Sequence, residues 1–245
     1  MWLRLTLRQN CLPHAYKPRQ HIAEFGRGRG FTMIEKRDPA GHEPTAAPVY
    51  SAYVCNNDEL IAQVARLYLK DGDRIADVSY GKGVFWRKVD LSRFDFRPSD
   101  ICTCPAARYD FRDLPYDDGS FDVVVLDPPY SHDPGRGMIT NSSYRNFETT
   151  GSLNHEGIVR LYADGMREAR RVLRPEGLLW VKCQDEIESG KQRMTHIEIH
   201  HHAIALGMIV EDLFVMVRPA PPPVQHRQKH SRKRHSYLWV FRKGS

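Results

Sequence analysis

The sequence predicts an α/β fold built on a mostly parallel sheet, with an antiparallel strand pair at its C-terminal end. Short apolar runs of strand length alternate with segments whose apolar residues recur at helical spacing, as expected when helices connect parallel strands. Near the C terminus, a proline-rich, basic connector joins two β-rich runs at 213–217 and 237–241. An antiparallel pair is the simplest arrangement for these two runs.

In the first half of the expected domain, the sequence predicts a helix, a strand and a turn. We expect a helix from Asp58, with Asn57 or Asp58 as its cap, because the apolar residues that follow recur three and four positions apart. These residues are Leu60, Ile61, Val64, Leu67 and Tyr68. A short buried strand is expected at 74–78, followed by a turn with two glycines and by a helix that opens at 84–86.

In the second half of the expected domain, the sequence predicts the central strands of the sheet. Residues 121–126 form the central strand by their length and β-branched content, 93–101 supply another strand that ends at Asp100, and 177–182 supply the next. An apolar stripe from Ile158 to Leu173 predicts a helix that ends at 174–177. Residues 131–154, rich in Gly, Ser, Thr and Asn, are too long for a simple connection and are either a substrate loop or partly disordered.

Length and composition indicate one domain with appendages. We expect an irregular basic arm at 1–48 and one folded domain at 49–245. No apolar stretch approaches the roughly 18 residues of a membrane span, and Arg4 and Arg8 interrupt the apolar start of the chain. We therefore expect no membrane association and a cytoplasmic location. The five cysteines are odd in number and irregularly placed, which fits reduced thiols.

The positive charge lies at the two ends of the chain. Residues 1–32 hold six Lys and Arg against one acid, and residues 213–245 hold eight against none, whereas the middle is net acidic. A localised basic surface is the electrostatic footprint of a protein that binds a phosphate backbone. Nucleic acid is the favoured partner, and a solubilising or disordered tail is the alternative.

The sequence predicts no metal site. Cys102 and Cys104 lack a second cysteine pair, and His196 and His200 have the spacing of a metal pair on a helix without a convincing further ligand. For the histidines we expect a partly exposed helix face instead.

The turn after the first strand has the properties of a ligand site. Gly81 and Gly83 permit positive φ and a close approach of the backbone to a ligand, and Asp77 at the strand end supplies an acceptor. The glycine fingerprint of dinucleotide sites is incomplete, because Trp86 occupies its third position. A bare turn without a ligand is the alternative on this evidence alone.

The central strand ends in Asp127-Pro128-Pro129-Tyr130, which suits chemistry on an amino nitrogen. The lone pair of an exocyclic amino group is delocalised into its ring, so the nitrogen is a poor nucleophile. Hydrogen bonds from its two N–H groups to the Asp127 carboxylate and the Pro128 carbonyl would favour a tetrahedral nitrogen with a free lone pair. The prolines fix the backbone, and Tyr130 can stack on an extruded base. A chance structural turn is the alternative.

These motifs resemble those of class I S-adenosylmethionine-dependent methyltransferases, which have a Rossmann-like fold. The turn at 77–83 resembles their first motif, residues 109–115 with 121–122 look like the segment before their fourth strand, and Asp127 to Tyr130 match the motif of DNA N6-adenine and N4-cytosine enzymes. The resemblance covers about residues 52–243. It implies S-adenosyl-L-methionine as the cofactor.

The resemblance also implies roles for single residues of the cofactor site. Asp77, Gly81 and Gly83 would line the methionine end, and Ser79 would also bind the cofactor. Asp100 would bind the ribose hydroxyls, with Asp95 or Asp90 as alternatives, and Asp110 would meet the adenine amino group.

The connector at 218–236 combines a proline-stiffened base with a row of cations. Its end is similar to that of a group of DNA and RNA amino-methyltransferases. We expect phosphate contacts from it, and a solvated loop without function is the alternative. The cations are Arg227, Lys229, Arg232, Lys233 and Arg234.

Together these features predict methyl transfer from S-adenosylmethionine to an exocyclic amino nitrogen of a nucleobase, with adenine N6 in double-stranded DNA as the leading target. Cytosine N4 is served by the same motif. An RNA amino-methyltransferase acting on adenine N6 or guanine N2 is the strongest alternative, and related tetrapeptides also occur in enzymes that methylate protein glutamine. A non-catalytic nucleic-acid-binding module would require Asp127 and the glycine turn to be vestigial.

Overall fold

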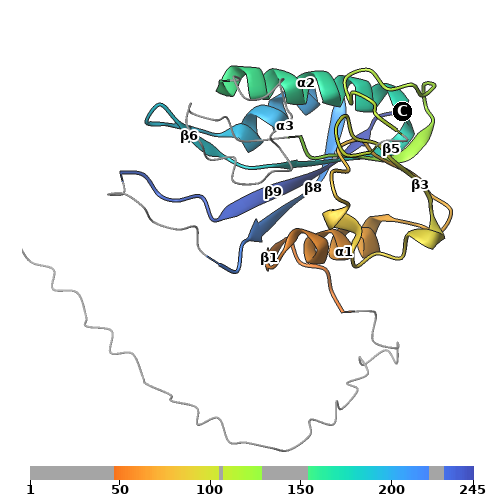
Figure 1. Cartoon of the computed structure of the whole chain (residues 1–245), viewed down its shortest axis with the longest axis horizontal. Helices are drawn as coiled ribbons and strands as arrows, with labels where there is room; N and C mark the ends of the chain where they lie inside the picture. The colour runs from red at the N-terminus through yellow and green to blue at the C-terminus, as the bar shows by residue number, and fades with distance from the viewer. Residues whose placement is uncertain (1–46, 105–106, 129–153, 221–228) are drawn as a thin grey trace, which may run out of the picture. The chain divides into compact units, whose positions relative to one another are not determined.

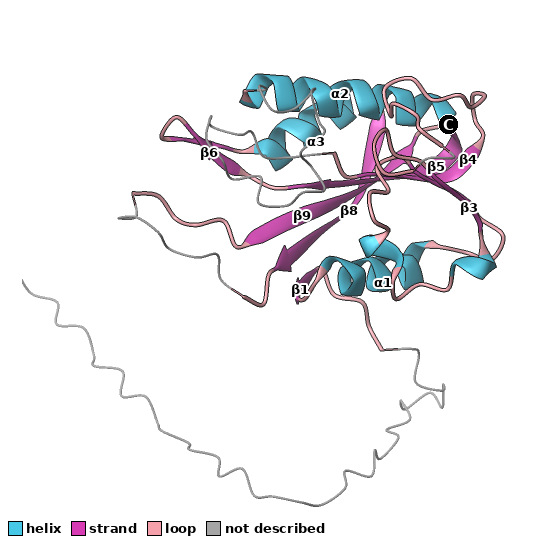
Figure 2. Ribbon diagram, in the orientation of Figure 1, coloured by secondary structure: helices cyan, strands magenta, loops and turns pink. Residues whose placement is uncertain are grey.

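A seven-stranded sheet forms the centre of the part of the chain that the computed structural model describes, which is residues 47–104, 107–128, 154–220 and 229–245. The strand order is β1-β8-β9-β5-β4-β2-β3 (Figures 1 and 2). The strands of this sheet are β1 (Ala52–Val54), β2 (Arg74–Asp77), β3 (Asp95–Pro98), β4 (Phe121–Leu126), β5 (Leu173–Cys183), β8 (Met208–Val217) and β9 (His235–Lys243). The helices are α1 (Asn57–Tyr68), α2 (His155–Val172) and α3 (Thr195–Ala205).

The sheet is mostly parallel, as the sequence predicts. Strands β3, β2, β4 and β5 pair parallel to one another in that order, and β1 pairs parallel to β8. The expected antiparallel pair is β8 and β9, but β9 lies between β8 and β5 and pairs antiparallel to both. The short strand β1, which the sequence did not indicate, then forms the edge beyond β8.

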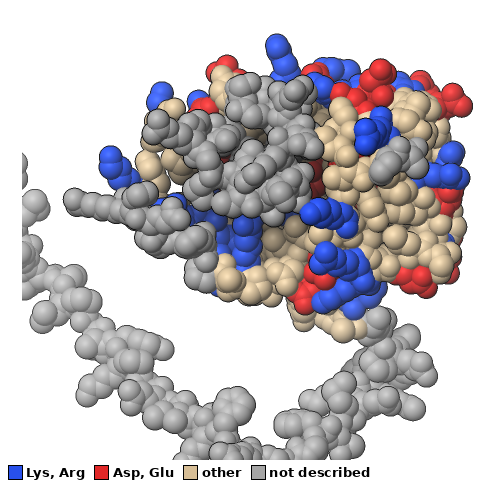
Figure 3. Space-filling model, in the orientation of Figure 1, with Lys and Arg blue, Asp and Glu red and all other residues tan. Residues whose placement is uncertain are grey.

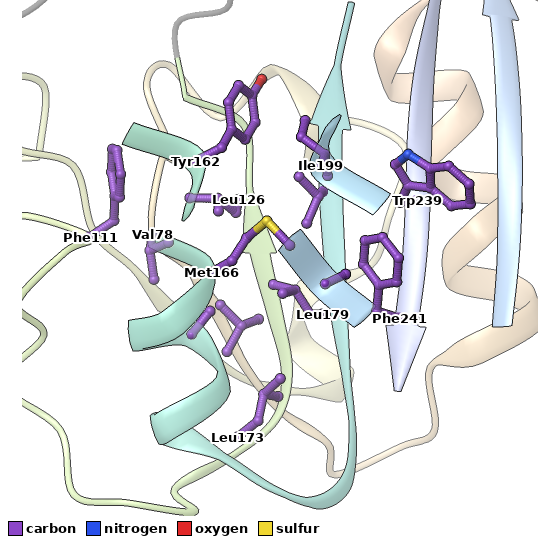
Figure 4. Close-up of a cluster of buried hydrophobic side chains, with 14 of the residues drawn as sticks. Val78, Phe111, Leu126, Tyr162, Met166, Leu173, Leu179, Ile199, Trp239 and Phe241 are labelled. Atoms are coloured by element: carbon purple, nitrogen blue, oxygen red, sulfur yellow. The ribbon is translucent and has the colours of Figure 1, made fainter. Parts of the chain in front are cut away.

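Helices cover both faces of the sheet: α2 and α3 lie on one face and α1 on the other (Figure 1). Alternate residues of the central strands supply the two cores, because side chains along a strand point to opposite faces. Leu126 and Leu179 belong to the cluster that packs against α2 and α3, part of which Figure 4 shows. Val125 and Trp180 belong to the cluster that packs against α1.

The start of α1 differs by one residue from the sequence expectation. Asn56 is the cap, and Asn57 and Asp58 already belong to the helix. The backbone N–H of Asn56 donates to Glu59 Oε2 at 2.9 Å, which is one half of a capping box. The glutamate three positions after the cap therefore decides where the helix begins.

Three further boundaries are corrected by the structure. Residues 84–86 form a single 3₁₀ turn instead of opening a longer helix, since Trp86 turns inward and donates its indole N–H to Asp77 Oδ2. The strand expected at 93–101 is shorter and ends at Pro98, so that Asp100 lies beyond it. Leu173 begins β5 instead of ending α2, and a register shift between Phe121 and Val123 accommodates the residues that follow it.

A short hairpin leads from the sheet to α3. It consists of β6 (Glu186–Glu188) and β7 (Lys191–Arg193), and no pattern in these residues had predicted it. His155, the first residue of α2, is buried against this hairpin, with Nδ1 2.9 Å from Glu186 Oε1 and Nε2 2.8 Å from Glu198 Oε1 of α3. Burial disfavours the imidazolium, but the two carboxylates outweigh it and raise the pKa of His155.

Several expectations fall outside the described residues. These are the arm at 1–48 apart from its last two residues, the segment 131–154 apart from Asn154, and the connector between 221 and 228. Among the helices that are described, none is both long and apolar enough to cross a membrane.

Gly165 of α2 sets how closely this helix approaches the sheet. A Cβ at this position would lie 2.8 Å from Phe111 Cδ2 and 3.3 Å from Leu126 Cδ2. We predict that Gly165→Ala lowers the free energy of unfolding by about 1–3 kcal/mol through overpacking, although the same change at an open helix position raises it by up to ~1 kcal/mol. Urea unfolding measures the difference. Arg160→Ala on the exposed face of α2 is the control and should change little; equal or higher stability of Gly165→Ala would contradict the packing argument.

Candidate cofactor pocket and active site

The pocket lies at the edge of the sheet where β2, β4 and β5 end. Asp77 at the end of β2 is level with Val125 of β4, and Leu126 is level with Val181 of β5. This register brings the residues that follow β2 and β4 to one place, where they and the loop after β3 line a pocket of about 170 Å³. Its lining consists of Asn57, Asp77, Val78, Ser79, Tyr80, Gly81, Lys82, Val84, Phe85, Asp100, Ile101, Phe111, Asp127 and Pro128.

The two glycines of the turn have the backbone conformation that the sequence analysis expected. Gly81 has φ +55° and Gly83 has φ +68°, in the left-handed region that favours glycine. A Cβ at Gly83 would lie 2.4 Å from the hydroxyl oxygen of Tyr80, which also lines the pocket. The missing side chain at Gly83 therefore allows the Tyr80 ring to lie against the turn.

Asp77 is buried at the base of this turn. Its Oδ1 accepts from the Ser79 N–H at 3.1 Å and its Oδ2 accepts from the Trp86 indole at 2.7 Å. Burial raises the pKa of Asp77 to about 7, although both hydrogen bonds favour the ionised form. Each carboxylate oxygen has a second lone pair, so Asp77 can still accept a ligand hydrogen bond.

Ser79 joins the two motifs that the sequence separates by about fifty residues. Its Oγ accepts from the backbone N–H of Asp127 at 2.6 Å. The hydroxyl group thus fixes the first residue after β4 against the glycine turn. Ser79 also lines the pocket, so its predicted place at the cofactor is compatible with this second, structural role.

Asp127 and Asn57 are the two lining residues with a buried side-chain oxygen that has no hydrogen-bond partner among the described residues, and Asp127 is the ionisable one. In Asp127 this atom is Oδ1. Burial raises the pKa of Asp127 to about 6, and the nearby Lys182 ammonium acts in the opposite direction. Pro128 lines the same pocket, while Pro129 and Tyr130 lie outside the residues that the structure describes.

Asp100 lies opposite, in the loop after β3. Its Oδ1 accepts from the backbone N–H groups of Cys102 and Thr103, and its Oδ2 accepts from that of Gly81 at 3.1 Å. Asp100 therefore braces the glycine turn from within the pocket lining. The alternatives Asp90 and Asp95 are not among the lining residues; Asp90 accepts from Ser92, and Asp95 pairs with arginines on the surface of the sheet edge.

Asp110 has a different setting from the other predicted residues. Its neighbour Phe111 lines the pocket, but Asp110 itself does not. The Asp110 carboxylate forms a two-pronged ion pair with Arg112, with distances of 2.9 Å from Nε to Oδ1 and 2.6 Å from Nη2 to Oδ2. The cofactor role of Asp110 stays a prediction.

The basic connector leaves β8 and enters β9 at this same edge, because β9 is antiparallel to both β5 and β8, so that β8 runs in the same direction as β5 and β4. Lys229 and Arg232 are exposed, and Lys233 is partly exposed. The Arg234 guanidinium turns back and donates to the carbonyl oxygen of Arg218 at 2.7 Å, so it closes the base of the connector. Arg227 lies outside the described residues. Lys and Arg side chains gather where β8 ends and β9 begins (Figure 3).

Two buried polar residues beside the site were assigned no role from the sequence, although Lys182 follows a strand run at the expected mouth of the active site. Lys182, near the end of β5, has 1% of its surface exposed and donates from Nζ to Ser236 Oγ at 2.6 Å. Ser236 is fully buried in β9. A signal was present, because a lysine closes the apolar run from Leu178 to Val181, but sequence alone does not show what such a lysine faces.

The histidines of α3 serve packing in the structure. His196 Nδ1 lies 2.7 Å from Asp185 Oδ1, and its ring stacks on Tyr237 with centroids 4.1 Å apart. His200 lies beside Trp239. No group of three or more potential metal ligands is found in the described ranges of the chain.

Solved structures resemble this fold. A candidate methyltransferase of Bacillus halodurans C-125 is 14% identical with a TM-score of 0.51, covering 76% of this chain and 99% of that chain. A chain of the complex between the Haloferax volcanii Trm112 methyltransferase activator and the candidate methyltransferase is 16% identical with a TM-score of 0.50, covering 77% and 89%. A candidate DNA modification methylase of Thermus thermophilus, complexed with S-adenosyl-L-methionine, is 17% identical with a TM-score of 0.40; the matched part covers 71% of this chain but only 56% of that protein. No curated protein sequence matches the chain.

The sheet topology and the structural likeness define the Rossmann-like fold of class I S-adenosylmethionine-dependent methyltransferases, as the sequence predicted. Residues 121–245, more than half of the chain, match the family model of DNA methylases. The chain therefore belongs to the DNA methylase family. S-adenosyl-L-methionine is the methyl donor of this class.

The close approach at Gly83 predicts an effect on cofactor binding. We expect Gly83→Ala to displace the Tyr80 ring and to weaken S-adenosylmethionine binding by at least about tenfold, measured by calorimetry. Gly72→Ala is the matched control, because Gly72 has φ +87° with no atom within 4 Å of its Cβ position. Unchanged affinity in Gly83→Ala, or equal loss in both variants, would contradict a specific role of the Tyr80 contact.

Proposed function

We propose that this protein methylates an exocyclic amino nitrogen of a nucleobase in double-stranded DNA, with adenine N6 as the leading target. The observation that carries the proposal is the buried Oδ1 of Asp127, which lacks a partner in the described part of the chain and belongs to a residue that lines the pocket at the end of β4. A buried acceptor without a donor is costly and rarely persists without a functional reason. A ligand that brings an N–H group to this atom removes the cost.

The residues around the pocket fit S-adenosylmethionine. The turn at Gly81 and Gly83 offers backbone without side chains, while Asp77 supplies a carboxylate for the positively charged amino group of the methionine end. Asp100 Oδ2 accepts one hydrogen bond from Gly81 and retains a lone pair for a ribose hydroxyl. When bound, the cofactor supplies a methyl group on a positively charged sulfur. We assign Ser79 to the methionine end as well. Asp110 stays the candidate partner of the adenine amino group of the cofactor.

Asp127 and Pro128 would act on the target nitrogen. The ionised Asp127 carboxylate accepts one N–H of the amino group and the Pro128 carbonyl accepts the other, which localises the nitrogen lone pair for attack on the methyl group. Asp127 also lies where it can take up the proton that the nitrogen must lose. Its position is fixed by the Ser79 hydrogen bond to its backbone, so the acceptor is oriented before the substrate arrives. Pro129 would hold the backbone, and Tyr130 would stack on the base.

The family favours DNA over RNA, and the charge distribution favours a nucleic-acid substrate. The family model describes DNA methylases. The cations of the connector lie at the edge of the sheet that carries the pocket, where a backbone phosphate can be bound while the base enters. The exposed cations Lys229, Arg232 and Lys233, together with Arg227, are assigned to this contact, while Arg234 shapes the base of the connector.

Two experiments test the proposal: identification of the methylated nucleoside, and removal of the Asp127 carboxylate. Wild-type protein with S-adenosylmethionine should form N6-methyladenine in duplex DNA, detected by nucleoside mass spectrometry. Asp127→Ala should lower this activity by at least about a thousandfold while cofactor affinity changes little, because the lost hydrogen bond is made to the base.

Parallel reactions with total RNA and with protein extract identify the alternatives. Asp164→Ala, which removes a carboxylate of α2 that pairs with Arg167, is the control and should retain activity. Methylation of RNA alone would retain the chemistry and refute the DNA substrate. Equal loss of cofactor binding and activity in Asp127→Ala would refute the role of Asp127.

The connector generates a second prediction. Replacing Lys229, Arg232 and Lys233 by Ala should weaken DNA binding and flatten its dependence on salt, since three phosphate contacts contribute about 2–3 to the slope of log K against log salt. Filter binding over a salt series measures the slope. The charge-matched control replaces the exposed residues Arg66, Lys70 and Arg167 and should leave the slope unchanged. A slope that does not change in the connector variant would assign these cations to solvent.

A further inference from the structure

Lys182 is a buried cation beside the proposed active site, and neither the sequence motifs nor the proposed mechanism assigns it a role. It has 1% of its surface exposed, whereas lysine is almost never fully buried without compensation. Its Nζ donates to the neutral hydroxyl oxygen of Ser236 at 2.6 Å. A hydroxyl group satisfies one donor of the ammonium but does not neutralise its charge.

The register of the sheet places the compensating charge. Leu126 of β4 is level with Val181 of β5, so the next residues, Asp127 and Lys182, are level on neighbouring parallel strands. Asp127 comes two positions after Val125, and Lys182 comes two positions after Trp180. Val125 and Trp180 pair with each other and pack on the face of the sheet that α1 covers. The two side chains therefore leave the sheet on this same face.

Ser236 completes the arrangement from the other side. Lys182 pairs with Leu238 of β9, and Ser236 is the diagonal neighbour two residues away on the same face. The Ser236 hydroxyl group, and not Asp127 Oδ1, accepts the hydrogen bond of the Lys182 ammonium. Asp127 Oδ1 consequently remains without a partner among the described residues, while a positive charge lies close by.

Within the described residues, three other charged or titratable groups act on Lys182 besides Asp127. Cys55 faces it from before α1, Cys183 follows it in β5, and Arg218 lies after β8. Burial lowers the pKa of Lys182, Asp127 opposes this effect most strongly, and Arg218 adds to it. On the pocket side, the charges of Asp127 and Asp100 both raise the pKa of Asp77.

We propose that Lys182 is a positioning residue that acts through Asp127, its Ser236-anchored ammonium holding the carboxylate in the charged form that accepts the N–H of the target base. The inference rests on the proposed function of Asp127. Lys182 itself does not touch the base, and the residue does not exchange a proton with the substrate. Its contribution is an electrostatic one in a water-poor site, where a charge at short range has a large effect.

The sign of the pH effect follows directly. In the proposed mechanism the ionised Asp127 carboxylate accepts the N–H of the base, so activity falls as the pH decreases through the Asp127 pKa of about 6. Lys182 lowers the pKa of Asp127, and its removal therefore raises this pKa. The acidic limb of the rate profile then moves toward higher pH, and the lost activity returns in alkaline buffer.

The experiment compares Lys182→Met with the wild type in two measurements. The first is kcat against pH with S-adenosylmethionine and duplex DNA, and the second is the titration of the Asp127 carboxyl carbon by NMR in the protein without substrate. Both midpoints should rise by about 1–3 pH units, the usual effect of a neighbouring opposite charge. KM for the cofactor should stay within about twofold, because Asp127 is not its main contact.

Matched variants separate charge from packing. Lys243→Met removes a half-buried lysine of the same strand pair at the opposite edge, where it donates to the Leu173 carbonyl at 2.5 Å, and should leave both midpoints unchanged. Ser236→Ala keeps the lysine but removes the hydrogen-bond acceptor of its ammonium, so Lys182 loses its proton more easily. Both midpoints should therefore move in the same direction as in Lys182→Met, by a smaller amount. This variant carries the test if Lys182→Met does not fold.

The outcomes distinguish the inference from the function on which it rests. If Asp127→Ala abolishes methyl transfer but neither Lys182→Met nor Ser236→Ala moves the midpoints, the role of Lys182 is refuted and the proposed function stands. If Asp127→Ala remains active, the proposed function fails first, and the NMR titration alone then decides whether the lysine controls the carboxylate.

Discussion

The alignment of β2, β4 and β5 at their carboxyl ends is the constraint on which the site depends. Because the three strands are parallel and their register is fixed by two buried cores, the residues that follow them cannot slip without turning apolar side chains to the wrong face. Asp77, Asp127 and Lys182 are brought together by this alignment, although more than one hundred residues separate the first from the last. The Ser79 hydroxyl then links two of the strand ends directly.

Holding charged groups in this position opposes stability. Burial raises the pKa of both Asp77 and Asp127, which means that the folded protein disfavours their ionised forms. Asp77 is compensated by hydrogen bonds from Ser79 and Trp86, whereas Asp127 retains an acceptor atom without a partner among the described residues. The fold compensates the group that shapes the turn and leaves unsatisfied the group that we assign to chemistry. Such a contrast is typical of a site organised for a ligand.

Strong local signals predicted much of the fold. The β-branched run at 121–126 and the two C-terminal runs are strands because each carries enough apolar side chains to specify burial by itself. Short strands such as β1 and the β6–β7 hairpin were missed, since three residues carry little periodicity and tertiary contacts decide their pairing. The pocket residues Asp77, Gly81 and Asp100 were found from motifs, but the partner of Lys182 depends on a strand register that no single segment encodes.

Where β9 begins, exposed charges of the connector and buried charges of the site lie within a few residues of each other. The connector cations lie in or near solvent, where dissolved ions screen charges beyond about 10 Å at 0.1 M salt. Ser236, the second residue of β9, and its partner Lys182 are buried, as is Asp127 Oδ1. Ionic strength therefore acts on the connector cations, whereas acidity acts on these buried groups. On the proposed function, a change of salt alters how firmly the polymer is held, whereas a change of pH alters the reactivity of the base once it has entered.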